Sequence, residues 1–285
     1  MKKPEPFQRP TRLEAVYRAE IERLFNNYFN FPTTATLGEI SARLVEYAQS
    51  QNFIQSFAHK LAERMITQVL FQNANSWRQA ASKSSKGKII YSILKNELAG
   101  GLGVQVQYLV RQNAKLISTV PRNVANVIAQ HIQERQMAGI RSEQIIKEIT
   151  PKMRQLKKYQ IARIARTEVA KADTAVTRVR AESIGLNWYQ WQTSEDQRVR
   201  PAHKVMDLVL VNWDDAPSPE QLDHMKSQGH YHAGNIYNCR CVALPLVSID
   251  EISFPARVYR RGQIKMLTKE GFRRISGLGQ KQIAA

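Results

Sequence analysis

The chain has 285 residues, of which 43% are hydrophobic, and carries 42 Lys and Arg against 24 Asp and Glu, a net charge of +18. A mean hydropathy of −0.43 and the lack of any apolar run of about 18 residues exclude a membrane-spanning helix. Two cysteines are too few for a disulfide scaffold. We therefore expect a soluble protein, made in a reducing compartment and long enough for two compact units.

The positive charge is unevenly distributed along the chain. Residues 1–184 carry 29 Lys and Arg against 14 Asp and Glu, residues 185–255 carry 5 against 9, and residues 256–285 carry 8 against 1. Such an excess of positive charge indicates a polyanionic partner. If that partner is nucleic acid, we expect the first and last segments to bind it, because the segment between them is acidic.

The first two-thirds of the chain is predicted to be mostly helical. Apolar residues recur at helical spacing through residues 11–116, with a polar break at residues 81–88. A short helix is expected to end at Pro151, since proline does not continue a helix. One long helix is then expected over about residues 152–184, because its apolar stripe is continuous and Gly185 can cap it.

After Gly185 the apolar pattern becomes typical of strands. The segment LNWYQWQT alternates along residues 186–193, and two or three further strands are expected after it. The sequence therefore predicts an α+β fold. We expect residues 1–150 to form a helical N-terminal domain. Residues 151–255 are expected to form a long helix followed by a small antiparallel β module. Residues 256–285 are expected to be a basic flexible tail, because they contain too few apolar residues for a core.

Three motifs follow one another in the second half of the chain. IARTEVAKADTAVTRVRAESIG leads into WQTSEDQRVRPAH, and YNCRC follows about 35 residues later. In this order and spacing the motifs resemble the phage Mu F-like family of minor head, or head morphogenesis, proteins of tailed bacteriophages. The resemblance is close over residues 161–246 and looser over residues 115–132 and 138–149.

The resemblance implies a low-copy component of the procapsid interior that associates with the portal protein. Scaffold protein, major capsid protein and non-specific double-stranded DNA are further expected partners, and no membrane is involved. The expected location is the capsid interior of the virion, and the host cytoplasm during assembly. We expect no enzyme and no cofactor. The alternative is a metal-dependent nuclease, hydrolase or transferase-like enzyme, although the sequence contains no H-E-x-x-H, Walker or G-x-S-x-G motif.

The three motifs also supply the residues of an expected structural network. A carboxylate at Asp196 can form bidentate pairs with Arg198 and Arg200 that fix a loop without catalysis. Contact with a ligand and a catalytic role are the alternatives. The predicted set is Arg166, Glu168, Asp196, Arg198, Arg200, His203, Asn238, Cys239, Arg240 and Cys241.

The two cysteines are expected in a strand, one residue apart, so that their side chains share a face with about 6.6 Å between them. This separation disfavours a disulfide. Two buried thiols that face one core are the preferred interpretation. Zinc is the alternative, although its usual knuckle has two to four residues between the cysteines. The candidate metal ligands are His203, Cys239, Cys241, His230 and His232.

The basic tail is predicted to contact DNA phosphates without sequence preference, the alternative being a tail that only keeps the protein soluble. Tyr259 or Phe272 is expected to add stacking on unpaired bases. The expected DNA-contacting residues are Arg257, Arg260, Arg261, Lys265, Lys269, Arg273, Arg274 and Lys281.

Overall fold

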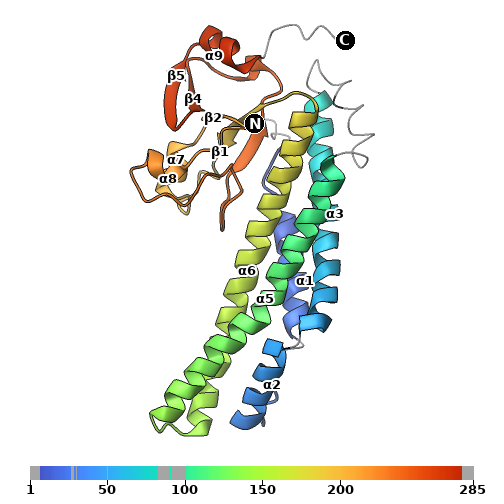
Figure 1. Cartoon of the computed structure of the whole chain (residues 1–285), viewed down its shortest axis with the longest axis vertical. Helices are drawn as coiled ribbons and strands as arrows, with labels where there is room; N and C mark the ends of the chain where they lie inside the picture. Colours follow the sequence, from blue (N-terminus) through green and yellow to red (C-terminus); the bar gives the residue numbers. More distant parts are fainter. Residues whose placement is uncertain are drawn as a thin grey trace. The chain divides into compact units, whose positions relative to one another are not determined.

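A computed structural model describes residues 7–26, 29, 31–49, 51–82, 90 and 101–277 (Figure 1). The predicted α+β fold is confirmed, because long helices make up most of the chain before residue 184 and a five-stranded sheet follows them. No helix in the described ranges combines the length and the apolar character needed to cross a membrane.

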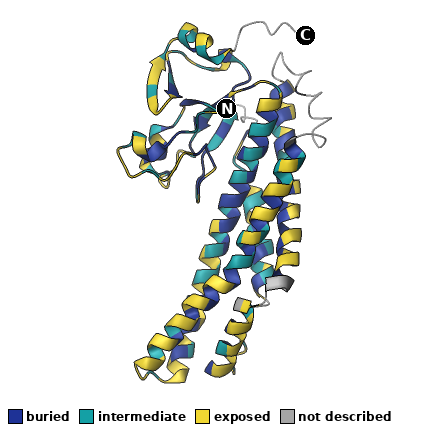
Figure 2. Ribbon diagram, viewed as in Figure 1, coloured by how far each residue is buried: buried dark blue, intermediate teal, exposed yellow. Residues whose placement is uncertain are grey.

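The long helices carry their apolar residues on one side. Figure 2 shows buried and exposed residues on opposite sides of these helices. The helix bounds are α1 Thr11–Asn26, α2 Leu37–Gln49, α3 Gln51–Ser82, α5 Gly101–Met137 and α6 Ser142–Ser183. Such one-sided burial, rather than helix propensity alone, stabilises helices of this kind.

The helix end predicted at Pro151 is wrong, because α6 runs through this residue without a break. Proline removes one backbone hydrogen bond from a helix. On both sides of it, however, Ile145, Ile149 and Met153 repeat every four residues and are at most 4% exposed. Burial of this continuous stripe offsets the lost hydrogen bond.

The chain divides into two compact units that do not follow sequence order. The helical unit contains Thr11–Gln68 and Val106–Val169, and the sheet unit contains Met1–Pro10, Val69–Gln105 and Ala170–Ala285. The boundaries fall inside α3, α5 and α6, so each of these helices contributes to both units. The domain boundary predicted at residue 150 lies inside α6.

The sheet has the strand order β3-β1-β2-β4-β5. Its pairs are antiparallel except for β2 with β4, which run parallel. The pairs inside the predicted module, residues 151–255, are antiparallel, and the parallel pair brings in β4 from the predicted tail. The strands are β1 Trp188–Gln192, β2 Leu210–Asn212, β3 Val242–Pro245, β4 Ala256–Arg260 and β5 Gln263–Leu267. Short helices connect them: α7 Pro201–Val205, α8 Pro219–Leu222 and the 3-10 turn η2 Ile249–Glu251, with α9 Lys269–Ser276 at the end.

The predicted flexible tail is wrong for residues 256–277, which form β4, β5 and α9. Phe272 is fully buried, and its ring meets Trp188 edge-on with 5.1 Å between centroids. Tyr259 is 2% exposed, so neither of the two predicted stacking residues faces solvent. The prediction failed because it considered only the apolar residues within this segment. These few residues complete a core whose other members lie earlier in the chain. Lys281 lies outside the described residues.

Candidate functional site

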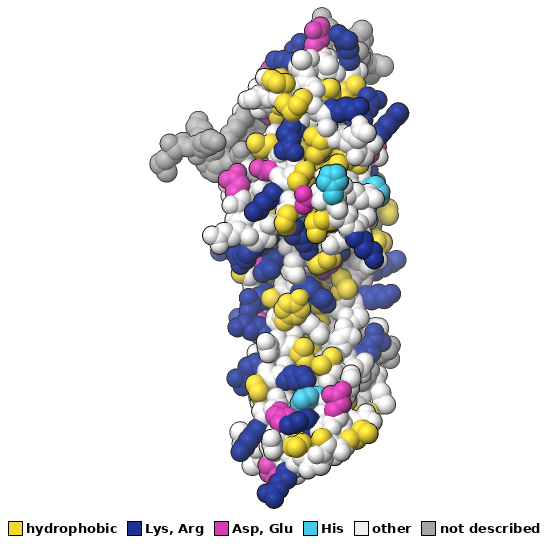
Figure 3. Space-filling view, turned by 90° about the vertical axis from the view of Figure 1, so that its left-hand side faces the viewer, with side chains coloured by type: hydrophobic (Ala, Val, Ile, Leu, Met, Phe, Trp, Pro, Cys, Tyr) yellow, Lys and Arg dark blue, Asp and Glu magenta, His cyan; other side chains and the backbone are white. Residues whose placement is uncertain are grey.

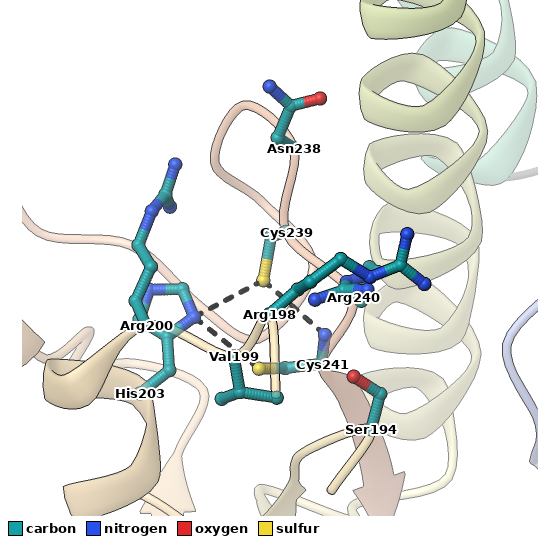
Figure 4. A pocket seen from close by; sticks show the side chains of 9 residues that line it. All are labelled: Ser194, Arg198, Val199, Arg200, His203, Asn238, Cys239, Arg240 and Cys241. Atoms are coloured by element: carbon teal, nitrogen blue, oxygen red, sulfur yellow. Dashed lines mark hydrogen bonds between the residues drawn. The ribbon is translucent and has the colours of Figure 1, made fainter. Parts of the chain in front are cut away.

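The motif residues of the sheet unit come from two loops and one short helix (Figure 4). Residues 194–200 follow β1, and Pro201 then begins α7, which carries His203 in its first turn. Residues 238–241 lie immediately before β3. Proline at the first helical position fixes the start of α7, and this places His203 beside the two cysteines.

Cys239 and Cys241 lie in an irregular segment between the turn at residues 237–238 and β3, so the prediction that they belong to a strand is wrong. Asn238 has a φ of +56°, a left-handed conformation that asparagine tolerates better than most residues. This bend lets the backbone N–H of Cys241 donate to Sγ of Cys239 at 3.4 Å. Both thiol side chains are buried, at 2% and 5% exposure.

The imidazole of His203 lies against both sulfur atoms. Its Nδ1 is 3.6 Å from Sγ of Cys239 and 3.4 Å from Sγ of Cys241. The ring is 2% exposed and packs edge-on against Trp191, with 5.6 Å between ring centroids. The three ligand atoms lie within 4.8 Å of one another.

A hydrogen-bonded chain determines which ring nitrogen of His203 carries the proton. The hydroxyl of Tyr231 donates to Oε1 of Glu220 at 2.5 Å and lies 3.1 Å from Nε2 of His203. Burial and the bond to Glu220 raise the pKa of Tyr231, so the phenol stays protonated. Since its hydrogen is given to Glu220, its oxygen accepts from Nε2–H. The lone pair of Nδ1 therefore points to the sulfurs.

The two thiols differ in acidity in this environment. A hydrogen bond from Cys241 lowers the pKa of Cys239 well below its usual value. The same hydrogen bond, together with burial, raises the pKa of Cys241. Cys239 is therefore the sulfur that carries negative charge most readily, as expected for a thiolate beside proton donors.

The carboxylate of Asp196 pairs with Arg240, whose Nη2 lies 2.7 Å from Oδ1, and not with the two predicted guanidiniums. Asp196 also accepts the backbone N–H of Arg198 at 2.8 Å, which tightens the loop after β1. Arg200 instead donates to the carbonyl of Tyr237 at 2.8 Å and stacks on that ring at 4.5 Å. The arginines thus brace the loop that carries the cysteines.

The remaining predicted residues lie elsewhere. Arg166 and Glu168 belong to the helical unit, where Arg166 pairs with Glu14 at 3.1 Å. His230 is exposed and contacts the carbonyl of Ala216. His232 is buried against the hydroxyl of Tyr189 at 3.1 Å, and burial lowers its pKa to about 4. Of the five candidate ligands, the structure brings together only the three that form the cluster.

Sequence reasoning missed Tyr231 and Glu220. Both lie between β2 and the YNCRC motif, in a stretch without apolar period or motif of its own. Tyr231 contacts His203, and Glu220 contacts Tyr231, but neither residue contacts the cysteines in the hydrogen bonds described here. The sequence spacing of the motif residues therefore does not indicate them. The segment SQGHYH contains Tyr231 between the two histidines that were predicted as candidate metal ligands.

A small cavity of about 10 Å³ adjoins the cluster. A cavity of this volume holds about one water molecule. Its lining residues are Ser194, Arg198, Val199, Arg200, His203, Asn238, Cys239, Arg240 and Cys241. The site can therefore accept one very small ligand beside the three soft donor atoms.

The predicted DNA-contacting residues fall into two groups. Arg257 donates to the carbonyls of Val205 and Asp207, and Lys269 pairs with Asp250 at 2.7 Å, so both are held within the sheet unit. The exposed ones define what we call the cationic surface: Arg260, Arg261, Lys265, Arg273 and Arg274.

Comparison with known proteins identifies the region that contains these motifs. Residues 123–244 match the family described as Phage Mu protein F like protein. This region belongs to that family. The match includes all three motifs, so the resemblance inferred from them is confirmed, and it supports a phage head morphogenesis protein.

A curated relative also matches the chain. It is an uncharacterised protein of Haemophilus influenzae, 25% identical over 169 residues, which are 59% of this chain and 35% of that protein. The chain thus spans little more than a third of the length of this relative. No solved structure matches the chain at a significant level.

Proposed function

We propose that the chain is a minor head protein of a tailed bacteriophage, associated with the portal inside the procapsid and in contact with packaged DNA. The match of residues 123–244 to the Mu F-like family carries this proposal. Its role is structural, because the family consists of phage structural and morphogenesis proteins. The protein is made in the host cytoplasm and is incorporated in the virion.

Two features support the DNA contact. The net charge is +18, and Figure 3 shows a face on which Lys and Arg side chains clearly outnumber Asp and Glu. The cationic surface adds a local concentration of charge: β4 pairs with β5 so that Val258 is opposite Lys265 and Arg260 opposite Gln263. Arg260 and Lys265 therefore lie on the same face of the hairpin. Positive charges presented in this way neutralise backbone phosphates without reading sequence.

Charge removal from the cationic surface tests the DNA contact. We expect the variant R260Q/R261Q/K265Q/R273Q/R274Q to bind duplex DNA more weakly, because each phosphate contact contributes about −0.9 to the slope of log affinity against log salt. The slope should become less negative by about 3 or more. Fluorescence anisotropy with a labelled duplex, measured over a range of salt concentrations, gives both quantities.

Substitutions are preferable to deletion here, because deleting residues 256–285 removes two strands and the buried Phe272. The matched control neutralises the same number of exposed cations in the helical unit: Arg12, Arg43, Lys60, Arg111 and Lys147. Unchanged affinity and slope in the first variant contradict the assignment of the contact to the cationic surface. A loss confined to the control assigns DNA binding to the helical unit.

A further inference from the structure

We propose that His203, Cys239 and Cys241 bind one zinc ion. The sequence favoured two buried thiols without a metal, because the spacing of the cysteines is shorter than in a usual zinc knuckle. The structure shows a third donor atom, from His203 in α7, close to the two sulfur atoms. The spacing of the cysteines in the sequence could not reveal it.

The nitrogen–sulfur distances in the cluster fit a tetrahedral site. With Zn–S bonds near 2.3 Å and a Zn–N bond near 2.05 Å, the tetrahedral angle puts nitrogen and sulfur about 3.6 Å apart. The observed separations from Nδ1 of His203 are 3.6 Å to Cys239 and 3.4 Å to Cys241. Both nitrogen–sulfur separations thus match those of a tetrahedral coordination sphere, and all three donor atoms lie within 4.8 Å of one another.

The surroundings of His203 match those of a metal-bound histidine. Such a histidine donates its other ring N–H to a hydrogen-bond partner, which fixes the tautomer and orients the ring. Nε2 has the hydroxyl of Tyr231 at 3.1 Å, and Tyr231 is in turn bound to the buried carboxylate of Glu220. Glu220 is 2% exposed and lies in α8, a separate element. Two buried polar residues therefore hold Nδ1 ready to donate its lone pair to a metal.

The segment that contains the cysteines also suits two thiolate ligands. A backbone N–H directed at sulfur stabilises negative charge on it, and the N–H of Cys241 has this relation to Cys239. Two thiolates and a neutral imidazole balance the 2+ charge of zinc, so the bound site is neutral, as burial demands. Binding releases two thiol protons to solvent, and each sulfur forms one bond to the ion. No electron transfer is involved.

The fourth ligand position faces the small cavity. Its volume of about 10 Å³ suits one water molecule. This position is too confined for an organic substrate, so we assign the ion a structural role. It links α7 to the segment before β3, and the two are 36 residues apart at His203 and Cys239.

Native mass spectrometry of the untagged full-length protein, purified from cells grown with added zinc, tests the proposal. We expect one species whose mass exceeds that of the chain by one zinc atom less two protons. H203A and C239S should each lose the zinc, whereas H230A should retain it, because His230 lies outside the cluster. Chelation should lower the melting temperature of the wild type by roughly 10 °C.

If H203A and C239S do not fold, measurements on the wild-type protein alone test whether the cluster binds zinc. Reconstitution with Co²⁺ is expected to produce thiolate-to-cobalt charge-transfer absorption, which requires sulfur ligands. A chain with no zinc and two free thiols overturns the proposal, and so does a chain that is two hydrogens lighter, the mark of a disulfide. Zinc retained at full stoichiometry in folded H203A also overturns it.

Discussion

Replacing Arg180 by methionine is expected to lower the free energy of unfolding of the sheet unit by about 3–5 kcal/mol. Arg180 is 3% exposed, and its Nη1 donates to Oδ1 of Asn73 at 2.7 Å and to the carbonyl of Leu70. Asn73 in turn donates to Asp173 at 2.8 Å. Methionine fills the space but leaves these buried acceptors without their hydrogen-bond donor. An acceptor that is buried without a partner loses its hydration and gains nothing in exchange, which destabilises the fold.

The loss should depend on pH. Burial raises the pKa of Asp173 to about 6, against its ordinary 3.8. Below that pKa the folded protein holds Asp173 neutral, and the missing cation matters less. We therefore expect a smaller effect at pH 5 than at pH 8, measured by urea denaturation.

R178M is the matched control on the same helix. The side chain of Arg178 is 37% exposed and pairs with Glu182 at 2.7 Å, and an exposed ion pair of this kind contributes less than about 1 kcal/mol. Equal losses in both variants contradict the account.

Replacing Gly234 by alanine is expected to lower the free energy of unfolding by about 2–4 kcal/mol. The φ of Gly234 is +81°, and a Cβ there would lie 2.5 Å from Oγ1 of Thr174 and 3.3 Å from the carbonyl oxygen of Cys241. Thr174 donates to the adjacent carbonyl of Ala233 at 2.8 Å. The added methyl group would push apart the loop and α6, which are in contact here.

Gly262 provides a control that separates backbone strain from crowding. Its φ is +82°, nearly that of Gly234, but a Cβ there meets nothing within 4 Å. G262A should therefore show only the conformational cost, about 1–2 kcal/mol. Chemical denaturation of both variants gives the comparison. A G234A variant no less stable than G262A means that the loop does not approach α6 as closely as described.

The helical part of the fold could be predicted because its apolar residues repeat at the period of a helix. The stripe of α6 includes Ile161, Ala165 and Val169, each at most 1% exposed. The end predicted at Pro151 was wrong because burial of Ile145, Ile149 and Met153 on both sides of this proline outweighs the one hydrogen bond that it removes. The flexible tail was wrong for a related reason: Phe272 packs on Trp188, which lies far away in sequence. Composition within one segment cannot register such a contact.

The candidate site could be predicted only in part. The motif order identified His203, Cys239 and Cys241, and the structure brings these together. Their arrangement could not be inferred, because it depends on a left-handed Asn238 and on Tyr231 acting through His203. The ion pair of Asp196 was assigned to the wrong arginines, since Arg240 approaches from a loop that follows more than 40 residues later.

The composition of purified phage heads tests the central claim most directly. Quantitative mass spectrometry of procapsids and of DNA-filled heads, from the phage that encodes this chain, measures the ratio of its peptides to those of the major capsid protein. A minor head protein should co-purify with both kinds of head, at a copy number far below that of the capsid protein. Peptides of the chain found only in the soluble fraction of the lysate, with intact heads that lack them, would contradict the proposed function.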